Sequence, residues 1–180
     1  MQIPVSFKLL LFWKNIFNKK VENPLIEISK EGRGVSSILF FLPEKREDAK
    51  IANYLVKVGN PLPGCKIGLF CSKKSKAFYP HSSNVKFFTY EDSDLNYFDT
   101  INSIALIDQI SSTKYDAIVD LNTDFCATST MLALELDAPL KIGFDSAIAR
   151  KIYTITLERK ENAFLEGYFS RILGILGVSI

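Results

Sequence analysis

Short apolar runs alternate with longer segments of helical periodicity from residue 36 onward. Six apolar runs have the length of strands and lie at residues 38–42, 66–71, 85–90, 115–121, 140–144 and 152–157. Four segments have the apolar spacing of helices and lie at residues 47–58, 100–110, 125–136 and 161–176. Strands that alternate with helices form βαβ units, which need a parallel sheet. We therefore expect a Rossmann-like α/β fold, a mostly parallel sheet with helices on both faces.

The first 34 residues have a different pattern, and we expect them to form a basic apolar arm ahead of one domain at 35–180. Residues 5–18 predict a short helix, and residues 21–34 have the proline and glycine content of a linker. The first 20 residues carry four lysines and no acid. Such a helix favours an anionic membrane interface, so residues 5–20 predict contact with a membrane surface. The alternative is that the arm packs on its own domain or covers a surface that a second half would bury.

Composition and charge exclude several classes of protein. The net charge of +2 is too small to indicate nucleic acid as a partner. Three cysteines without a CxxC pair and a single histidine give no metal-ligand spacing, so we expect no metal and a reducing, cytoplasmic location. The apolar stretch Leu9–Trp13 is too short to cross a bilayer. The loop after the first predicted strand has no glycine, which argues against a dinucleotide, and we expect no cofactor.

Chemistry in such a fold is expected in the loops that follow the carboxyl ends of the strands. Asp48 follows the first strand, near a helix N-terminus that favours a carboxylate, and is a candidate general base for a sugar hydroxyl. Asp48 and Glu47 also suit the simpler role of first-turn helix acids. Asn122 follows the fourth strand, where it is either a site residue or a helix cap. Asp145 follows the fifth strand.

The motifs in the second half of the chain resemble a known family. Residues 115–121 read YDAIVDL, and residues 138–145 read APLKIGFD. This pair is similar to the "YDLVIDLQ … RIGFD" signature of the ADP-heptose:lipopolysaccharide heptosyltransferases, glycosyltransferase family 9. The closing helix at 161–177 is similar to that family's "ERYLRLLEALG" helix, and Asp48 falls where the family has "IRLGALGD". The resemblance covers roughly residues 36–178.

The resemblance implies one half of a GT-B type enzyme with two Rossmann-like halves. The N-terminal half of that family holds the acceptor, and its first-loop aspartate corresponds to Asp48. Glu47, Asn122 and Asp145 would then contact the acceptor. The nucleotide-sugar donor binds the other half, which we expect as a separate partner. Glu44 and Glu47 stand where the family has glycine. Two functions stay open: half of a heptosyltransferase-like enzyme of lipopolysaccharide or cell-envelope glycan synthesis, inactive alone, or a non-catalytic binding or interaction module.

Overall fold

The computed structural model describes residues 4, 6–10, 12, 35–58, 65–79, 85–159 and 164–177, with the backbone alone at 55–58. The predicted linker at 21–34 lies outside these residues, as do most of the helix predicted at 5–18 and the start of the one predicted at 161–176. Within the described part the elements are β1 (Ser37–Phe41), α2 (Arg46–Val58), β2 (Lys66–Ser72), η1 (Lys76–Phe78), β3 (Val85–Tyr90), η2 (Asp92–Asp94), α3 (Ile104–Ser111), β4 (Ala117–Asp120), α4 (Ala127–Glu135), β5 (Leu140–Phe144), α5 (Ala149–Ile152), β6 (Ile155–Leu157) and α6 (Leu165–Ile175).

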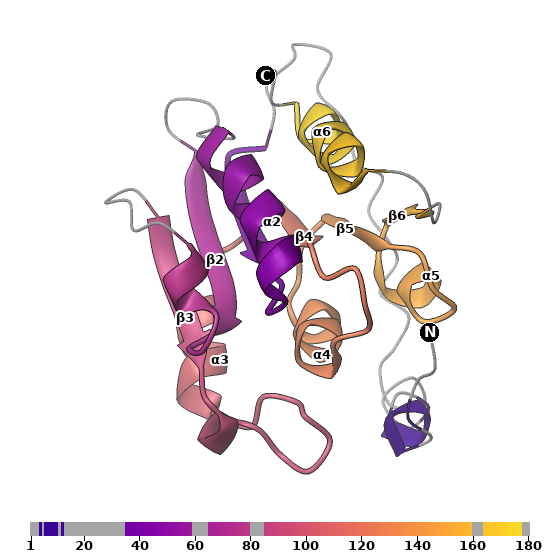
Figure 1. The fold of residues 1–180 in the computed structure, drawn as a ribbon. Helices are drawn as coiled ribbons and strands as arrows, with labels where there is room; N and C mark the ends of the chain where they lie inside the picture. The colour runs from indigo at the N-terminus through magenta and orange to yellow at the C-terminus, as the bar shows by residue number, and fades with distance from the viewer. Residues whose placement is uncertain are drawn as a thin grey trace.

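The six strands form one parallel sheet in the order β3-β2-β1-β4-β5-β6 (Figure 1). The chain moves outward from β1 to β3 on one side, then returns to β4 and moves outward on the other side. The strand order therefore reverses between β1 and β4, and the loops after these two strands diverge at that point. Open parallel sheets bind ligands at such a switch point, beyond the carboxyl ends of the strands.

Helices cover both faces of the sheet, as the sequence predicts. On one face α2 and α6 pack against each other and on β1, β2 and β4, with Ala49, Ala52 and the apolar stripe of α6 in the core. On the other face α3 and α4 cover the sheet through Leu106, Ile110 and Leu132. Every residue of β1 and β4 is buried. Their continuous apolar sequences thus reflect strands that are covered on both sides.

Two predicted elements differ from the structure. The helix predicted from residue 100 begins at Ile104, after the N-cap Ser103, whose Oγ accepts a hydrogen bond from the Leu106 backbone. The residues before it form a loop. Of the residues predicted as a strand at 152–157, only Ile155–Leu157 form one, which is β6. The prediction began too early because Ile152 is the last residue of the short helix α5. A four-residue helix is too short to show a helical period.

Candidate functional site

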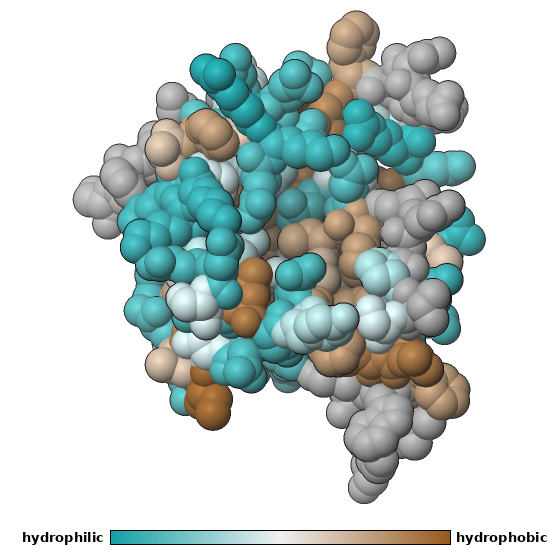
Figure 2. All heavy atoms as spheres, turned by 60° about the horizontal axis from the view of Figure 1, so that its bottom comes forward, coloured by the Kyte–Doolittle hydropathy of each residue, from teal (hydrophilic) through white to brown (hydrophobic). Residues whose placement is uncertain are grey.

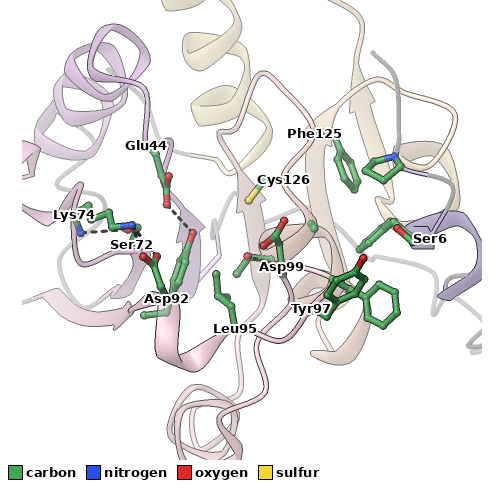
Figure 3. A pocket seen from close by; sticks show the side chains of 16 residues that line it. Ser6, Glu44, Ser72, Lys74, Asp92, Leu95, Tyr97, Asp99, Phe125 and Cys126 are labelled. Atoms are coloured by element: carbon green, nitrogen blue, oxygen red, sulfur yellow. Dashed lines mark hydrogen bonds and ion pairs between the residues drawn. The ribbon is translucent and has the colours of Figure 1, made fainter.

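Two neighbouring cavities open at the carboxyl edge of the sheet, beside the switch point. The larger, which we call the edge cavity, has a volume of about 430 Å³ and is lined from the loops after β1, β2, β3 and β4 (Figure 3). The smaller, which we call the switch cavity, has a volume of about 220 Å³ and is lined by the loops after β1 and β4. Glu44, Phe125 and Cys126 line both cavities. Figure 2, in which the bottom of Figure 1 is turned toward the viewer, shows hydrophilic and apolar side chains side by side on this face.

Asp48 and Asn122, two of the predicted site residues, meet at the switch cavity. Asp48 lies in the first turn of α2, and its Oδ2 accepts a hydrogen bond of 2.7 Å from Thr123 Oγ1. The loops after β1 and β4 are also joined by an ion pair between Lys45 and Asp124. Glu47 is exposed on the same helical turn and does not line either cavity. The structure therefore groups Asp48 with Asn122 and leaves Glu47 outside the cavities.

A buried carboxylate that the sequence did not single out holds Asn122 in place. Asp120 ends β4, and its Oδ1 accepts hydrogen bonds from the backbone N and Nδ2 of Asn122, at 2.9 and 2.7 Å. Its Oδ2 accepts hydrogen bonds from Ser129 Oγ at 2.8 Å and from the Tyr153 hydroxyl at 2.6 Å. Burial raises the pKa of Asp120, and these hydrogen bonds limit the rise because they favour the ionised form. Asn122 thus receives its position from the end of the strand and does not act as a side-chain cap of α4.

Asp145 follows β5 and does not line either cavity. Its two oxygens accept hydrogen bonds from Arg150 Nε and Nη2, at 2.8 and 2.5 Å. The hydrogen bond with Arg150 lowers the pKa of Asp145. This geometry gives Asp145 a local role between β5 and α5, and its contact with an acceptor stays a prediction.

A braced loop at residues 95–101 forms one wall of the edge cavity. Leu95 and Ile101 form an antiparallel bridge at its base. Inside the loop, Asn96 Oδ1 accepts hydrogen bonds from the backbone N of Phe98 and Thr100, at 2.9 and 3.3 Å. The loop presents two aromatic rings, Tyr97 and Phe98, whose centroids are 5.5 Å apart. The sequence analysis missed Tyr97 and Phe98 because they lie between the strand predicted at 85–90 and the helix predicted at 100–110, where no element was predicted.

Part of the N-terminal arm lies against the same edge. Residues 6–10 and 12 are helical, and Phe7 is buried, with its ring 4.9 Å from that of Phe125 in an edge-to-face contact. Pro4 and Ser6 line the edge cavity together with Phe7. Leu9 and Phe12, by contrast, are 61% and 63% exposed. This short helix therefore has one side anchored on the domain and another that faces solvent.

The charges around the two cavities are mostly acidic. Of the residues that the structure describes, five carboxylates and two lysines line them: Glu44, Asp48, Asp92, Asp99 and Asp124, with Lys45 and Lys74. Lys74 Nζ lies 2.8 and 2.7 Å from the two oxygens of Asp92, so one of these acids already neutralises it. Lys73 and Lys74, which follow β2, are exposed to solvent and form ion pairs with two acids that follow β3, Glu91 and Asp92.

Comparison with known proteins places this geometry in a wider context. Residues 11–171 match DUF6913, a family of unknown function. The chain belongs to this family. No curated protein matches it in sequence.

Solved structures resemble this DUF6913 chain in fold. The E. coli heptosyltransferase WaaC with ADP aligns with a TM-score of 0.58 and 14% identity, over 79% of this chain and 48% of WaaC. The glycosyl transferase family 9 protein from Veillonella parvula DSM 2008 aligns with a TM-score of 0.59 and 18% identity, over 80% of this chain and 42% of its own. The chain therefore spans about half the length of these proteins or less. The expected likeness to glycosyltransferase family 9 and to one half of a GT-B enzyme is confirmed at the level of the fold.

The remaining reactive groups of this DUF6913 chain narrow the possible chemistry. Burial raises the pKa of Cys71 to about 11 and also raises that of Cys126, which disfavours the nucleophilic thiolate. Across the residues that the structure describes, no three Asp, Glu, His or Cys side chains lie close enough to share a metal ion. None of the described helices has the length and apolar character to cross a membrane. Carboxylates, hydroxyls and aromatic rings are thus the groups that this edge offers to a ligand.

Proposed function

We propose that this chain is the acceptor-side half of a heptosyltransferase-like glycosyltransferase, and that it binds a sugar acceptor at the carboxyl edge of its sheet. The observation that carries the proposal is the pair of cavities at the switch point of a fold shared with family 9 enzymes. A volume of about 430 Å³ lies within the range of small-molecule sites. In this proposal the enzyme acts in the synthesis of lipopolysaccharide or another cell-envelope glycan.

Asp48 is the general base in this proposal. Asp48 lies in the first turn of α2 and lines the switch cavity, and the hydrogen bond from Thr123 fixes the orientation of its carboxyl group. A carboxylate held in this way can accept the proton of an acceptor hydroxyl as that oxygen attacks the donor sugar. Asn122, which Asp120 holds beside it, would bind another hydroxyl of the same acceptor.

Catalysis in this proposal needs a second polypeptide. Glycosyl transfer requires acceptor and donor to be held in line, and the acceptor-side half supplies only one of the two. A donor-binding Rossmann-like half is therefore the proposed partner. The competing proposal is a non-catalytic binding or interaction module. It is favoured by Glu44, which fills part of both cavities at a family glycine position and accepts a hydrogen bond of 2.9 Å from Tyr90.

The test combines a turnover assay with a binding assay. The purified full chain is incubated with ADP-heptose and saccharide fragments of lipopolysaccharide, and release of ADP is followed. We expect no ADP release by the chain alone, and saccharide binding in saturation-transfer NMR that weakens on Asn122→Ala. ADP release by the pure chain would refute the need for a partner. Absence of saccharide binding would refute the acceptor-side function and favour the interaction module.

We also propose that the arm at residues 5–20 brings the protein to the inner face of the cytoplasmic membrane. The outward side of the N-terminal helix carries Leu9 and Phe12 beside Lys8, and the arm as a whole carries four lysines and no acid. The alternative is that the arm packs on its own domain. The buried Phe7 supports this alternative for the side of the helix that faces the domain, but not for the side that carries Leu9 and Phe12. One side can thus anchor the helix while the other meets lipid.

Co-sedimentation with vesicles tests the membrane proposal. The double variant Leu9→Ser/Phe12→Ser should bind anionic vesicles several-fold less than the wild type at low salt. The matched control, Ile104→Ser/Phe164→Ser, removes two exposed apolar side chains from elsewhere on the domain and should bind as the wild type does. Wild-type protein that stays in the supernatant would refute the proposal.

A further inference from the structure

The edge cavity is poorly suited to a negatively charged ligand. Among the residues that the structure describes, three carboxylates line it, from Glu44, Asp92 and Asp99, against one lysine, Lys74. Both oxygens of Asp92 bind the Lys74 ammonium group, so the charge of this lysine already has a partner of opposite sign. In Figure 3, Asp99 lies between Glu44 and Asp92 on one side and Tyr97 on the other. The described part of the lining therefore has an excess of negative charge.

The aromatic wall of the cavity is exposed and yet held in place. Tyr97 is 92% exposed, so its ring contributes little to the stability of the domain. The loop that carries it is nevertheless fixed by Asn96, whose backbone and side chain exchange hydrogen bonds with Thr100, and by Thr128 Oγ1, which donates a 2.7 Å hydrogen bond to the Asp99 carbonyl. Because the loop backbone is already fixed, the exposed Tyr97 ring can offer a flat apolar surface to a ligand without the cost of ordering the loop.

We propose, building on the sugar-binding function proposed above, that the edge cavity takes an uncharged or amino-substituted sugar and rejects sugars that carry phosphate or carboxylate groups. The sugar ring stacks its C–H face on Tyr97. Asp99, Asp92 and Glu44 accept hydrogen bonds from hydroxyl or ammonium groups at the rim of the ring. An ammonium group gains further from the negative field and from the aromatic face.

The expected discrimination follows from Coulomb's law. A phosphate dianion about 6 Å from one carboxylate in bulk water is disfavoured by about tenfold in affinity. The stacked ring removes about 40 Å² of apolar surface from water, which corresponds to about a fivefold gain in affinity. A single exposed carboxylate such as Asp99 changes the affinity for an ammonium group by about two- to fivefold.

The experiment titrates the full chain with four pyranoses by saturation-transfer NMR: glucose, glucosamine, glucose 6-phosphate and glucuronate. We expect glucosamine to bind at least as well as glucose. Relative to glucosamine, the monoanion glucuronate should bind about tenfold more weakly and the dianion glucose 6-phosphate about 20- to 50-fold more weakly. The preference for glucosamine should shrink as salt is raised, because salt screens exposed charges.

Two variants and two controls assign the effect to residues. Tyr97→Ala should weaken all four sugars by about fivefold. Asp99→Asn should lower the ratio of glucosamine to glucose affinity by about two- to fivefold, and asparagine suits the positive φ of 55° at this position. The controls are Tyr54→Ala, which removes a tyrosine that is 67% exposed on α2, and Asp108→Asn on α3; neither residue lines the cavity. Both should leave every affinity unchanged.

The outcomes separate this inference from the function on which it rests. If glucose 6-phosphate or glucuronate binds as tightly as glucosamine, the charge selectivity is wrong while sugar binding stands. If Tyr97→Ala binds as the wild type does, the stacking surface is wrong. If no pyranose binds the chain at all, both the inference and the sugar-binding function are refuted.

Discussion

Replacing Gly143 with alanine tests whether the Tyr153 ring couples β5 to the buried network around Asp120. A Cβ atom at Gly143 would lie 2.6, 2.7 and 3.0 Å from three ring atoms of Tyr153. Cβ atoms do not approach carbon that closely, so the ring has to move. The hydroxyl of that ring donates the 2.6 Å hydrogen bond to Asp120 Oδ2. The chain thus either tolerates the overlap or gives up this hydrogen bond.

The variant should adopt whichever of these two responses lowers the free energy of unfolding less. Overpacking by one methyl group costs about 1–3 kcal/mol, and loss of a hydrogen bond to a charged acceptor costs about 1.5–3 kcal/mol. Alanine also reduces the entropy of the unfolded chain, which offsets about 0.4–1 kcal/mol. We therefore expect Gly143→Ala to lower the free energy of unfolding by about 0.5–2.5 kcal/mol. For a domain of this size that corresponds to a decrease in Tm of roughly 1–10 °C.

Urea denaturation of four variants measures the effect and its origin. Gly143→Ala should lose most of its cost in a Tyr153→Ala background, because the overlap no longer exists there. The matched control is Gly167→Ala on α6, where a Cβ would meet nothing within 4 Å and where alanine should stabilise by about 0.5–1 kcal/mol. If Gly143→Ala costs as much without the Tyr153 ring as with it, the proposed coupling between β5 and Asp120 is refuted.

Three further predictions concern carboxylates. Asp116→Ala should destabilise by roughly 1.5–3 kcal/mol at pH 7, because Asp116 Oδ2 accepts hydrogen bonds from Ser36 and Ser37. Burial pushes the pKa of Asp116 up, but these hydrogen bonds outweigh burial and hold the pKa below 3.8. The stabilisation by Asp116 should therefore be complete above about pH 4 and disappear in stronger acid. A difference in stability between variant and wild type that is equal at pH 2 and pH 7 would contradict this. For Asp120, burial raises the pKa, so its contribution to stability falls as the pH rises from 3.8 through the folded pKa, and urea titrations should show the advantage of the wild type over Asp120→Asn shrinking in that window. Asp48→Asn, assayed with a donor-binding half, should lower turnover by about 10²–10⁴-fold with an unchanged Tm, and unchanged turnover would remove Asp48 from the mechanism.

The strands were predictable because strands that are buried on both faces have continuous apolar sequences. β1 and β4 are buried along their whole length, and continuous apolar runs are what such strands require. The loop at 95–101 was less predictable, since Ile101 and Ile104 have helical spacing although Ile104 is exposed and Ile101 bridges to Leu95. The loop is fixed by hydrogen bonds of the Asn96 side chain, and a periodicity of apolar residues carries no information about them.

The candidate site likewise contains residues that the sequence predicted and residues that it did not. Asp48 and Asn122 were recognised because they follow predicted strands, and the edge of a parallel sheet brings such positions together. Asp120 was missed as a separate feature because it lies inside an apolar run, although an acid at the end of a buried strand is itself a signal of a satisfied polar network. Tyr153 reaches Asp120 from 33 residues away, a contact that no local pattern specifies.

The loops around the two cavities are each fixed by contacts of their own. Asn96 braces the loop after β3, Asp120 holds Asn122 after β4, and Thr123 ties that second loop to Asp48 after β1. A domain that served only as a spacer would gain little from ordering exposed loops, because each ordered residue costs conformational entropy that surface contacts barely offset. Loops that are already ordered let a ligand bind without that cost. The order of these loops supports the proposal that the carboxyl edge binds an acceptor, and in that proposal a donor-binding half would add the second substrate.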